Sequence, residues 1–129
     1  MSVELKYLAV VTLFTGLIWV PYILNTISVR GMMEAVGYPE NPRPIAAWAA
    51  RMKLGHSNAV ENLVIFAGLV LVAHAAGVTN QITALASAIY FWARVVHLVS
   101  YTFAIPWIRT LAFAIGFGCQ MTFAWQILS

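Results

Sequence analysis

Four long apolar stretches constrain the fold of this chain more than any other feature of its sequence. We expect helices at residues 6–27, 44–77, 80–104 and 107–128, and each contains an apolar run near the ~20 residues that span a bilayer core of ~30 Å. Backbone groups in lipid must be hydrogen-bonded within the protein, and the alternating pattern of a membrane β-barrel is absent. The sequence therefore predicts an all-α, integral membrane four-helix bundle that forms a single domain over residues 1–129.

The scarcity of charge supports this interpretation. Only 9% of the residues are charged and 62% are apolar, with a mean hydropathy of +0.84, whereas a soluble domain carries about 25% charged residues. The net charge of +3 comes without a cluster of basic residues, so no nucleic-acid partner is expected. No pair of histidines with ligand spacing joins a carboxylate, so no metal site is expected. Cys119 is the only cysteine, which excludes an intrachain disulfide.

The basic residues indicate how the chain is oriented in the membrane. The 28–53 segment holds four of the seven: Arg30, Arg43, Arg51 and Lys53. The short third connection, at Pro106, leads into Arg109. By the positive-inside rule we expect the first and third connections to face the cytoplasm and both termini to lie on the opposite side. Pro21 is expected to bend the first helix, and Pro44 to stand in the first turn of the second.

Polar side chains interrupt the apolar segments, where a charge costs ~2.5–3.5 kcal/mol on insertion scales. Asn58 and Glu61 are three residues apart and share a face of the second helix. Arg94, His97 and Tyr101 share a face of the third. We expect Glu61 to be tolerated because it meets Arg94 across a helix interface.

Two interpretations of these groups remain open at this point. In the structural one, Glu61 and Arg94 lock two helices together, Asn58 makes an interhelical hydrogen bond, and Arg109 reaches toward the headgroups. His97 and Tyr101 would then be packed polar side chains whose hydrogen bonds are satisfied within the bundle. In the functional interpretation, the same residues surround a ligand.

Three motifs resemble those of a known family. "RMKLGHSNAVENLVIF", residues 51–66, looks like the second-helix motif of the MAPEG family, the membrane-associated proteins in eicosanoid and glutathione metabolism. "ARVVHLVSYTFAIPWIRTL", residues 93–111, is similar to the family's third helix and the start of its fourth. "VPYILNTISVRGMMEAVGYPENPRP", residues 20–44, resembles the first connection of bacterial members. Together the motifs extend the resemblance over nearly the whole chain.

This resemblance implies a homotrimer of four-helix protomers, with glutathione as co-substrate between neighbouring protomers. The residues that it assigns to glutathione binding are Arg30, Arg51, Asn58, Glu61, Arg94, His97 and Tyr101. Arg109 resembles the arginine that stabilises the glutathione thiolate, and is the expected catalytic residue. The implied function is that of a membrane-bound glutathione-dependent transferase or peroxidase acting on lipophilic electrophiles, with a lipophilic small molecule or lipid as second substrate.

The chain departs from the family pattern at two positions. Some eicosanoid-forming members have an arginine where this chain has Leu54, and a tyrosine where it has Phe113. The alternative function is therefore a non-enzymatic trimeric membrane protein, whose polar cluster is structural or binds another anionic, lipid-like ligand. A transporter has little support, because no internal repeat and no Gly/Pro-broken helix pair is visible.

Overall fold

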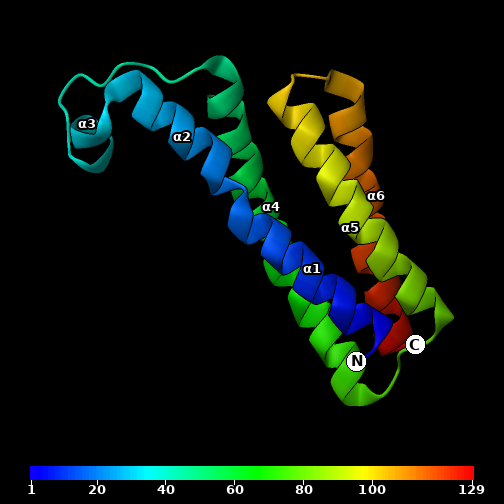
Figure 1. Cartoon of the computed structure of the whole chain (residues 1–129). Coiled ribbons are helices and arrows are strands. Elements are labelled where there is room, and N and C mark those ends of the chain that lie inside the picture. The colour runs from blue at the N-terminus through cyan, green and yellow to red at the C-terminus, as the bar shows by residue number, and fades with distance from the viewer.

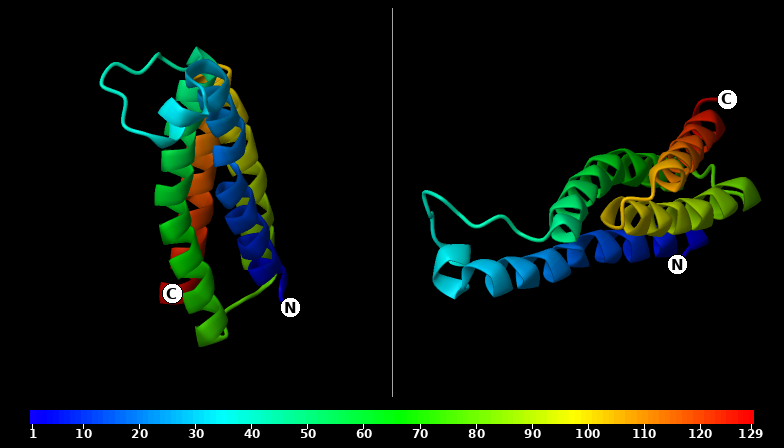
Figure 2. Two further views of the ribbon diagram at one scale, coloured as in Figure 1. Left: turned by 60° about the vertical axis from the view of Figure 1, so that its left-hand side comes forward. Right: turned by 90° about the horizontal axis from the view of Figure 1, so that it is seen from above.

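The computed structural model describes residues 1–129 and contains helices but no strands (Figure 1). The helices in chain order are α1 (Val3–Leu17), α2 (Trp19–Arg30), α3 (Met32–Val36), α4 (Ala47–Ala76), α5 (Gln81–Thr102) and α6 (Pro106–Leu128). Both termini lie at one end of the bundle, and α3 and the α5–α6 link lie at the other (Figures 1 and 2).

Four helical spans are long and apolar enough to cross a membrane. They cover Val3–Arg30, Ala47–Ala76, Gln81–Thr102 and Pro106–Leu128. This confirms the prediction of an all-α four-helix architecture that fits a multi-pass integral membrane protein. The short helix α3 was not foreseen within the first connection.

The first span is interrupted at Ile18, between α1 and α2. Pro21 lacks the N–H that would bond the carbonyl of Leu17, and its ring crowds that carbonyl. The Ile18 N–H bonds the carbonyl of Thr15 at 3.4 Å, a three-residue step in place of the regular four. The proline therefore disturbs the helix one turn before itself.

Helix α4 begins at Ala47, so the expectation that Pro44 stands in its first turn is wrong. Ala46, just before the helix, is extended with a ψ of 147°. Its N–H donates to Asn25 Oδ1 of α2 at 2.9 Å. The start of α4 is thus set by a side chain from another helix.

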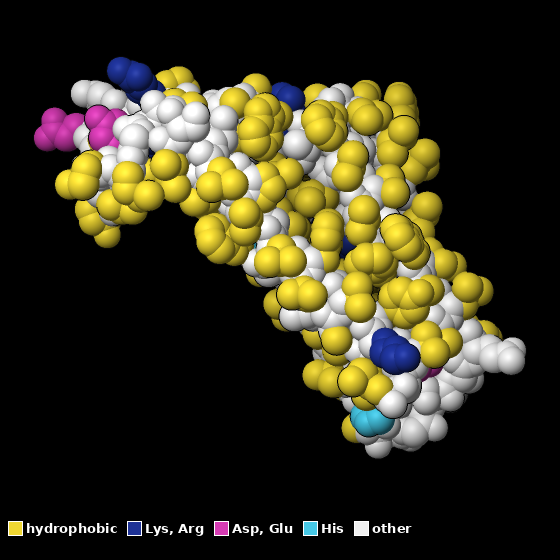
Figure 3. Space-filling view, viewed as in Figure 1, with side chains coloured by type: hydrophobic (Ala, Val, Ile, Leu, Met, Phe, Trp, Pro, Cys, Tyr) yellow, Lys and Arg dark blue, Asp and Glu magenta, His cyan; other side chains and the backbone are white.

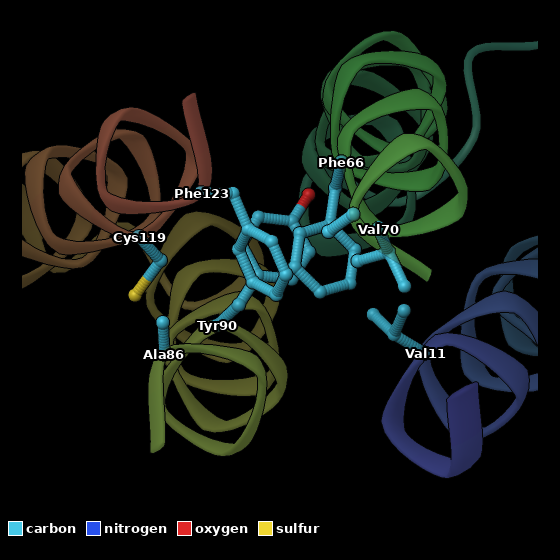
Figure 4. Packing of buried hydrophobic residues seen from close by; sticks show 8 residues of the cluster. Val11, Phe66, Val70, Ala86, Tyr90, Cys119 and Phe123 are labelled. Carbon is cyan, nitrogen blue, oxygen red and sulfur yellow. The ribbon is translucent and has the colours of Figure 1, made fainter. Parts of the chain in front are cut away.

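An aromatic cluster packs the middle of the bundle (Figure 4). The rings of Phe66 from α4 and Tyr90 from α5 stack with centroids 3.8 Å apart. Phe123 from α6 meets Phe66 edge-on at 5.8 Å. Val11 of α1 is buried beside them, so all four spans contribute to one core.

Polar bonds close the end of the bundle that holds the termini. Glu4 of α1 is only 4% exposed and accepts a hydrogen bond from Thr83 Oγ1 of α5 at 2.7 Å. Asn80 caps α5 and also donates to Gln126 Oε1 of α6 at 2.7 Å. These hydrogen bonds join α1, α5 and α6 at the end of the bundle that holds both termini.

A tight turn at that other end joins α5 to α6. The Ile105 N–H bonds the carbonyl of Ser100 at 2.8 Å, and the Ala104 N–H bonds that of Tyr101 at 3.3 Å. Ala104 has a φ of 58°, in the left-handed region that glycine usually occupies at such a helix end. The turn brings the first residues of α6 directly beside the end of α5.

Candidate functional site

Arg94 of α5 and Asn58 of α4 form the central contact of the candidate site. Arg94 is 3% exposed, and its Nη2 donates to Asn58 Oδ1 at 2.7 Å. Its Nε is buried without a partner. Glu61 forms no ion pair with Arg94 and lies on the exposed surface of α4, so the predicted pairing is wrong within a protomer. Asn58 and Glu61 are about 60° apart around the helix axis, and the rotation of α4 that directs Asn58 at Arg94 leaves Glu61 exposed.

Two further amides extend this contact to α6. Asn62 Nδ2 donates to the backbone carbonyl of Asn58 at 3.0 Å and to its Oδ1 at 3.3 Å. Gln120 Nε2 donates to the carbonyl of Asn62 at 3.2 Å. We call Gln120, Asn62, Asn58 and Arg94 the amide–guanidinium chain. It links α4, α5 and α6 inside the bundle. The sequence feature that could have indicated it is Gln120, an amide within the apolar run "GFGCQMTFAW".

Two glycines let the helices approach closely enough for these bonds. A Cβ added to Gly55 of α4 would lie 3.1 Å from Leu98 Cδ1 and 3.6 Å from Tyr101 Cβ. A Cβ added to Gly116 of α6 would lie 3.7 Å from Arg94 Cδ. The stem of Arg94 therefore packs against α6, while α4 passes close to α5 beside Tyr101.

A polar hollow of ≈ 330 Å³ opens beside the chain. Its lining residues are Asn58, His97, Tyr101, Arg109, Thr110 and Phe113. His97 is 2% exposed, and its Nδ1 has no hydrogen-bond partner. The hollow thus contains one cation and a buried ring nitrogen, but no carboxylate.

A second hollow of ≈ 170 Å³ adjoins the first, because Tyr101 and Arg109 line both. Arg51 also lines it, and Arg51 Nε donates to the carbonyl of Thr102 at 2.8 Å. The guanidinium carbon of Arg109 lies 4.8 Å from the centroid of the Tyr101 ring, a cation–π contact. Arg109 and Arg51 therefore stand at one polar region from two different helices.

The structure brings together most of the residues that the sequence singled out. Those in or beside the two hollows are Arg51, Asn58, Arg94, His97, Tyr101 and Arg109. Arg30 lies apart, where its Nε donates to the carbonyl of Arg43 at 2.7 Å. Thr110, Asn62 and Gln120 join the site without having been predicted. No three His, Cys, Asp or Glu side chains form a group that could hold a metal ion.

The hollows are suited to an anion with several oxygen acceptors. Arg51 and Arg109 offer guanidinium groups, which bind carboxylates in a bidentate manner. Tyr101 and Thr110 add hydroxyl groups, and Asn58 adds an amide. The arrangement can therefore hold a small carboxylate-bearing molecule at one end of the membrane helices.

Comparisons with known proteins give one match. No curated protein and no solved structure matches the chain. The model of the MAPEG family matches residues 7–129. That range includes every residue lining the two hollows and all of the amide–guanidinium chain. The family resemblance seen in the motifs is thereby confirmed, and the chain belongs to the MAPEG family.

Proposed function

We propose that the protein is a membrane-bound glutathione-dependent transferase or peroxidase that acts on lipophilic electrophiles. Its family includes glutathione transferases and peroxidases. The observation that carries the proposal is that Arg51 and Arg109 line adjoining hollows. A third guanidinium, that of Arg94, donates a hydrogen bond to Asn58 in the wall of the first hollow. A cluster of cations without a carboxylate among the lining residues favours an anionic ligand.

The chemistry of glutathione fits these groups. The tripeptide carries two carboxylates, and arginine binds carboxylates better than lysine because its planar fork matches their geometry. The thiol must lose its proton before it can act as a nucleophile. A guanidinium beside the sulfur favours the thiolate in a site of low dielectric constant. Arg109 has this role in the proposal, and the ring of Tyr101 holds its guanidinium in place.

The second substrate would arrive from the lipid. Phe113 borders the polar hollow and is 39% exposed on α6, so the rim of the hollow is apolar where it meets the membrane. Trp107, on the same helix, is 77% exposed. A lipophilic electrophile that dissolves in the bilayer could reach the sulfur along this apolar rim without crossing water.

We further propose that the protein assembles as a homotrimer and that a neighbouring protomer completes the site. Glu61 is exposed on α4 between Val60 and Val64, which are exposed as well. A carboxylate facing lipid is costly, and a neighbouring protomer would remove it from lipid. The Glu61 carboxylate could then accept hydrogen bonds from the ammonium group of glutathione. Native mass spectrometry in mild detergent should give trimers, and monomers alone would contradict the assembly.

Glutathione titration of the detergent-purified protein tests the proposed function. A saturating concentration should raise the melting temperature by mass action, worth ~2.7 kcal/mol at 100 times the Kd. Arg51→Ala should weaken binding about tenfold or more, because it removes a charge-assisted contact of at least ~1.4 kcal/mol. The matched control is Lys6→Ala, which removes an exposed cation at the opposite end of the bundle and should leave binding unchanged.

Turnover is tested separately from binding. With a lipophilic aryl halide or a lipid hydroperoxide as second substrate, Arg109→Ala should lower kcat more than it raises KM, because the thiolate is needed in the chemical step. The aryl halide reports transfer and the hydroperoxide reports peroxidase activity. A protein that neither binds glutathione nor turns over either substrate would support the non-enzymatic alternative, in which the polar cluster only joins helices.

A further inference from the structure

The segment between α2 and α4 projects sideways from the bundle and carries large apolar side chains in the open (Figures 2 and 3). Their exposed fractions are 57% for Met32, 83% for Met33, 70% for Val36 and 101% for Tyr38. No helix of the protomer covers them. We call these four residues the arm patch.

Hydrogen bonds at both ends hold this segment in a fixed direction. At its start, the Gly31 N–H bonds the carbonyl of Ile27 in α2 at 2.8 Å, and the Gly31 carbonyl accepts from the Ala35 N–H of α3 at 3.0 Å, so Gly31 joins the two helices. At its end, Arg30 Nε donates to the carbonyl of Arg43 at 2.7 Å, and Asn25 Oδ1 accepts from the Ala46 N–H at 2.9 Å. The arm patch therefore has a defined orientation relative to the membrane helices.

The polarity of the segment is divided between two sides. Val36 lies four residues after Met32 and three after Met33, so the three side chains are neighbours on one part of the surface of α3. In Figure 3 the apolar side chains of the projecting segment gather on its lower side, beside the bundle, and the acidic ones stand at its outer tip. Such a division lets the apolar side of the segment enter the edge of a membrane while its polar tip stays in water.

The depth of the segment fits the boundary of the bilayer. The Val3–Arg30 span has 28 residues and is therefore about 42 Å long, which exceeds the ~30 Å hydrocarbon core. The last turns of α2 thus reach the headgroup layer, where α3 begins. In both side views α3 lies no farther out than the ends of α4, α5 and α6 (Figures 1 and 2).

We propose that the arm patch inserts into the boundary between headgroups and acyl chains of the bilayer that the four spans cross. Leaving such side chains in water costs ~1.5–3 kcal/mol each, and lipid is the apolar phase adjacent to them. Helix α2, from which the segment extends, also has an exposed apolar side chain in Leu24, which is 60% exposed. Tyr38 is suited to the headgroup layer, as aromatic side chains with a polar tip are. Arg30 and Arg43, at the base of the segment, are suited to lipid phosphates. The proposal does not depend on glutathione.

Labelling of the full-length protein in phosphatidylcholine vesicles tests this proposal. In a Cys119→Ser background, Met33→Cys carries a fluorescent label within the patch, and Asn41→Cys carries the same label on the polar part of the same segment. Lipids with a nitroxide near the headgroup should quench the Met33 label several-fold more than the Asn41 label. Aqueous iodide should give the opposite order. Equal quenching of both labels by iodide would overturn the proposal.

The alternative is that a second copy of the chain, rather than lipid, covers the arm patch. The same labelling experiment distinguishes the two. A Met33 label that is protected from iodide but not quenched by lipid would mean that protein covers the patch, which also overturns the proposal.

A label-free measurement guards against an effect of the label. A glutamate-specific protease should cleave after Glu40, which is exposed and followed by Asn41, several-fold faster when Met32, Met33 and Val36 are all changed to serine, because the segment would leave the membrane. An unchanged cleavage rate would contradict insertion.

Discussion

Arg94 is a guanidinium enclosed by membrane helices, and its hydrogen-bond partner is an amide rather than a carboxylate. The Oδ1 of Asn58 accepts from Arg94 and also lies 3.3 Å from Asn62 Nδ2, so one oxygen serves two donors. A buried charge without a counter-ion is unstable unless its partners are held firmly. The amides of Asn62 and Gln120 supply this support from two helices.

The contact between Asn58 and Arg94 should appear as an energetic coupling. Asn58→Ala and Arg94→Met should each lower the free energy of unfolding by about 1.5–3 kcal/mol, the value of a hydrogen bond to a charged group. The double variant should cost less than the sum, because no unpaired guanidinium remains. Glu61→Ala is the matched comparison and should be additive with Arg94→Met. Thermal unfolding in detergent measures the wild type and all five variants, and additivity of Asn58→Ala with Arg94→Met would contradict the contact.

Gln120 does not line the hollows, but we expect it to hold Asn58 in place through Asn62. Gln120→Met removes the donor to Asn62 and should lower stability by about 0.5–1.5 kcal/mol. It should also weaken glutathione binding, because Asn58 loses part of its support. Gln126→Met is the control on the same helix, since Gln126 bonds Asn80 at the far end of the bundle. Equal glutathione affinities for the two variants would show that the amide–guanidinium chain does not act on the site.

Helical periodicity explains which residues could be predicted for the site. Arg94, His97 and Tyr101 share a face of one helix, so a single rotation brings them to the same interface. The partner of Arg94 could not be predicted, because Asn58 and Glu61 differ by only about 60° around α4 and the rotation of that helix decides between them. That rotation depends on packing at Gly55, which is a tertiary effect.

Helices α4 and α5 end in the same hydrogen-bond pattern but with different residues. At the end of α4, the Gly77 N–H bonds the carbonyl of His74 and the Val78 N–H bonds that of Ala73. Gly77 has a φ of 69°, and Ala104 has a φ of 58° at the equivalent place after α5. The left-handed conformation costs an L-residue roughly 1–2 kcal/mol, and glycine adopts it freely.

A reciprocal pair of substitutions tests this comparison. Ala104→Gly should stabilise the protein by about 0.5–1 kcal/mol, because relief of strain exceeds the extra entropy of glycine in the unfolded chain. Gly77→Ala should destabilise it by a similar amount. Melting temperatures should thus move in opposite directions. Two shifts of the same sign would mean that the turns are not equivalent.

Local chemistry explains why some helix boundaries could be predicted and others could not. The effect of Pro21 arises within one turn of the same helix, so the sequence was sufficient to anticipate it. The start of α4 depends on Asn25, which is far from Ala46 along the chain. Ala104 gave no signal either, because alanine rarely marks the left-handed end of a helix.

At the scale of the whole molecule, the membrane environment determines what the sequence can reveal. Lipid requires spans of sufficient length, so composition and hydropathy alone predicted four of them. An even number of spans places both termini at one end, as Figure 1 shows. The projecting arm was beyond prediction, because its direction is fixed by bonds from Arg30 and Asn25.

The orientation of the bundle in the membrane remains a prediction. Arg30, Arg43 and Arg51 lie toward the end of the bundle where the first connection and the α5–α6 link meet, and we expect this end to face the cytoplasm. Asn41→Cys in the Cys119→Ser background should react with a membrane-impermeant maleimide only when the reagent reaches the cytoplasmic face. An added cysteine before Val3 should react only from the opposite face. Reaction of Asn41→Cys from that opposite face alone would reverse the orientation.

The bond between Glu4 and Thr83 has a consequence for biosynthesis. The two residues are 79 positions apart, so at ~5–20 residues per second Thr83 follows Glu4 from the ribosome after about 4–16 s. During that interval the carboxylate of the first span has no permanent donor, and Val11 lacks the core that α5 and α6 complete. The first span must therefore wait, inserted but unassembled, until the third arrives. The end of the bundle where the chain begins is thus among the last parts to close.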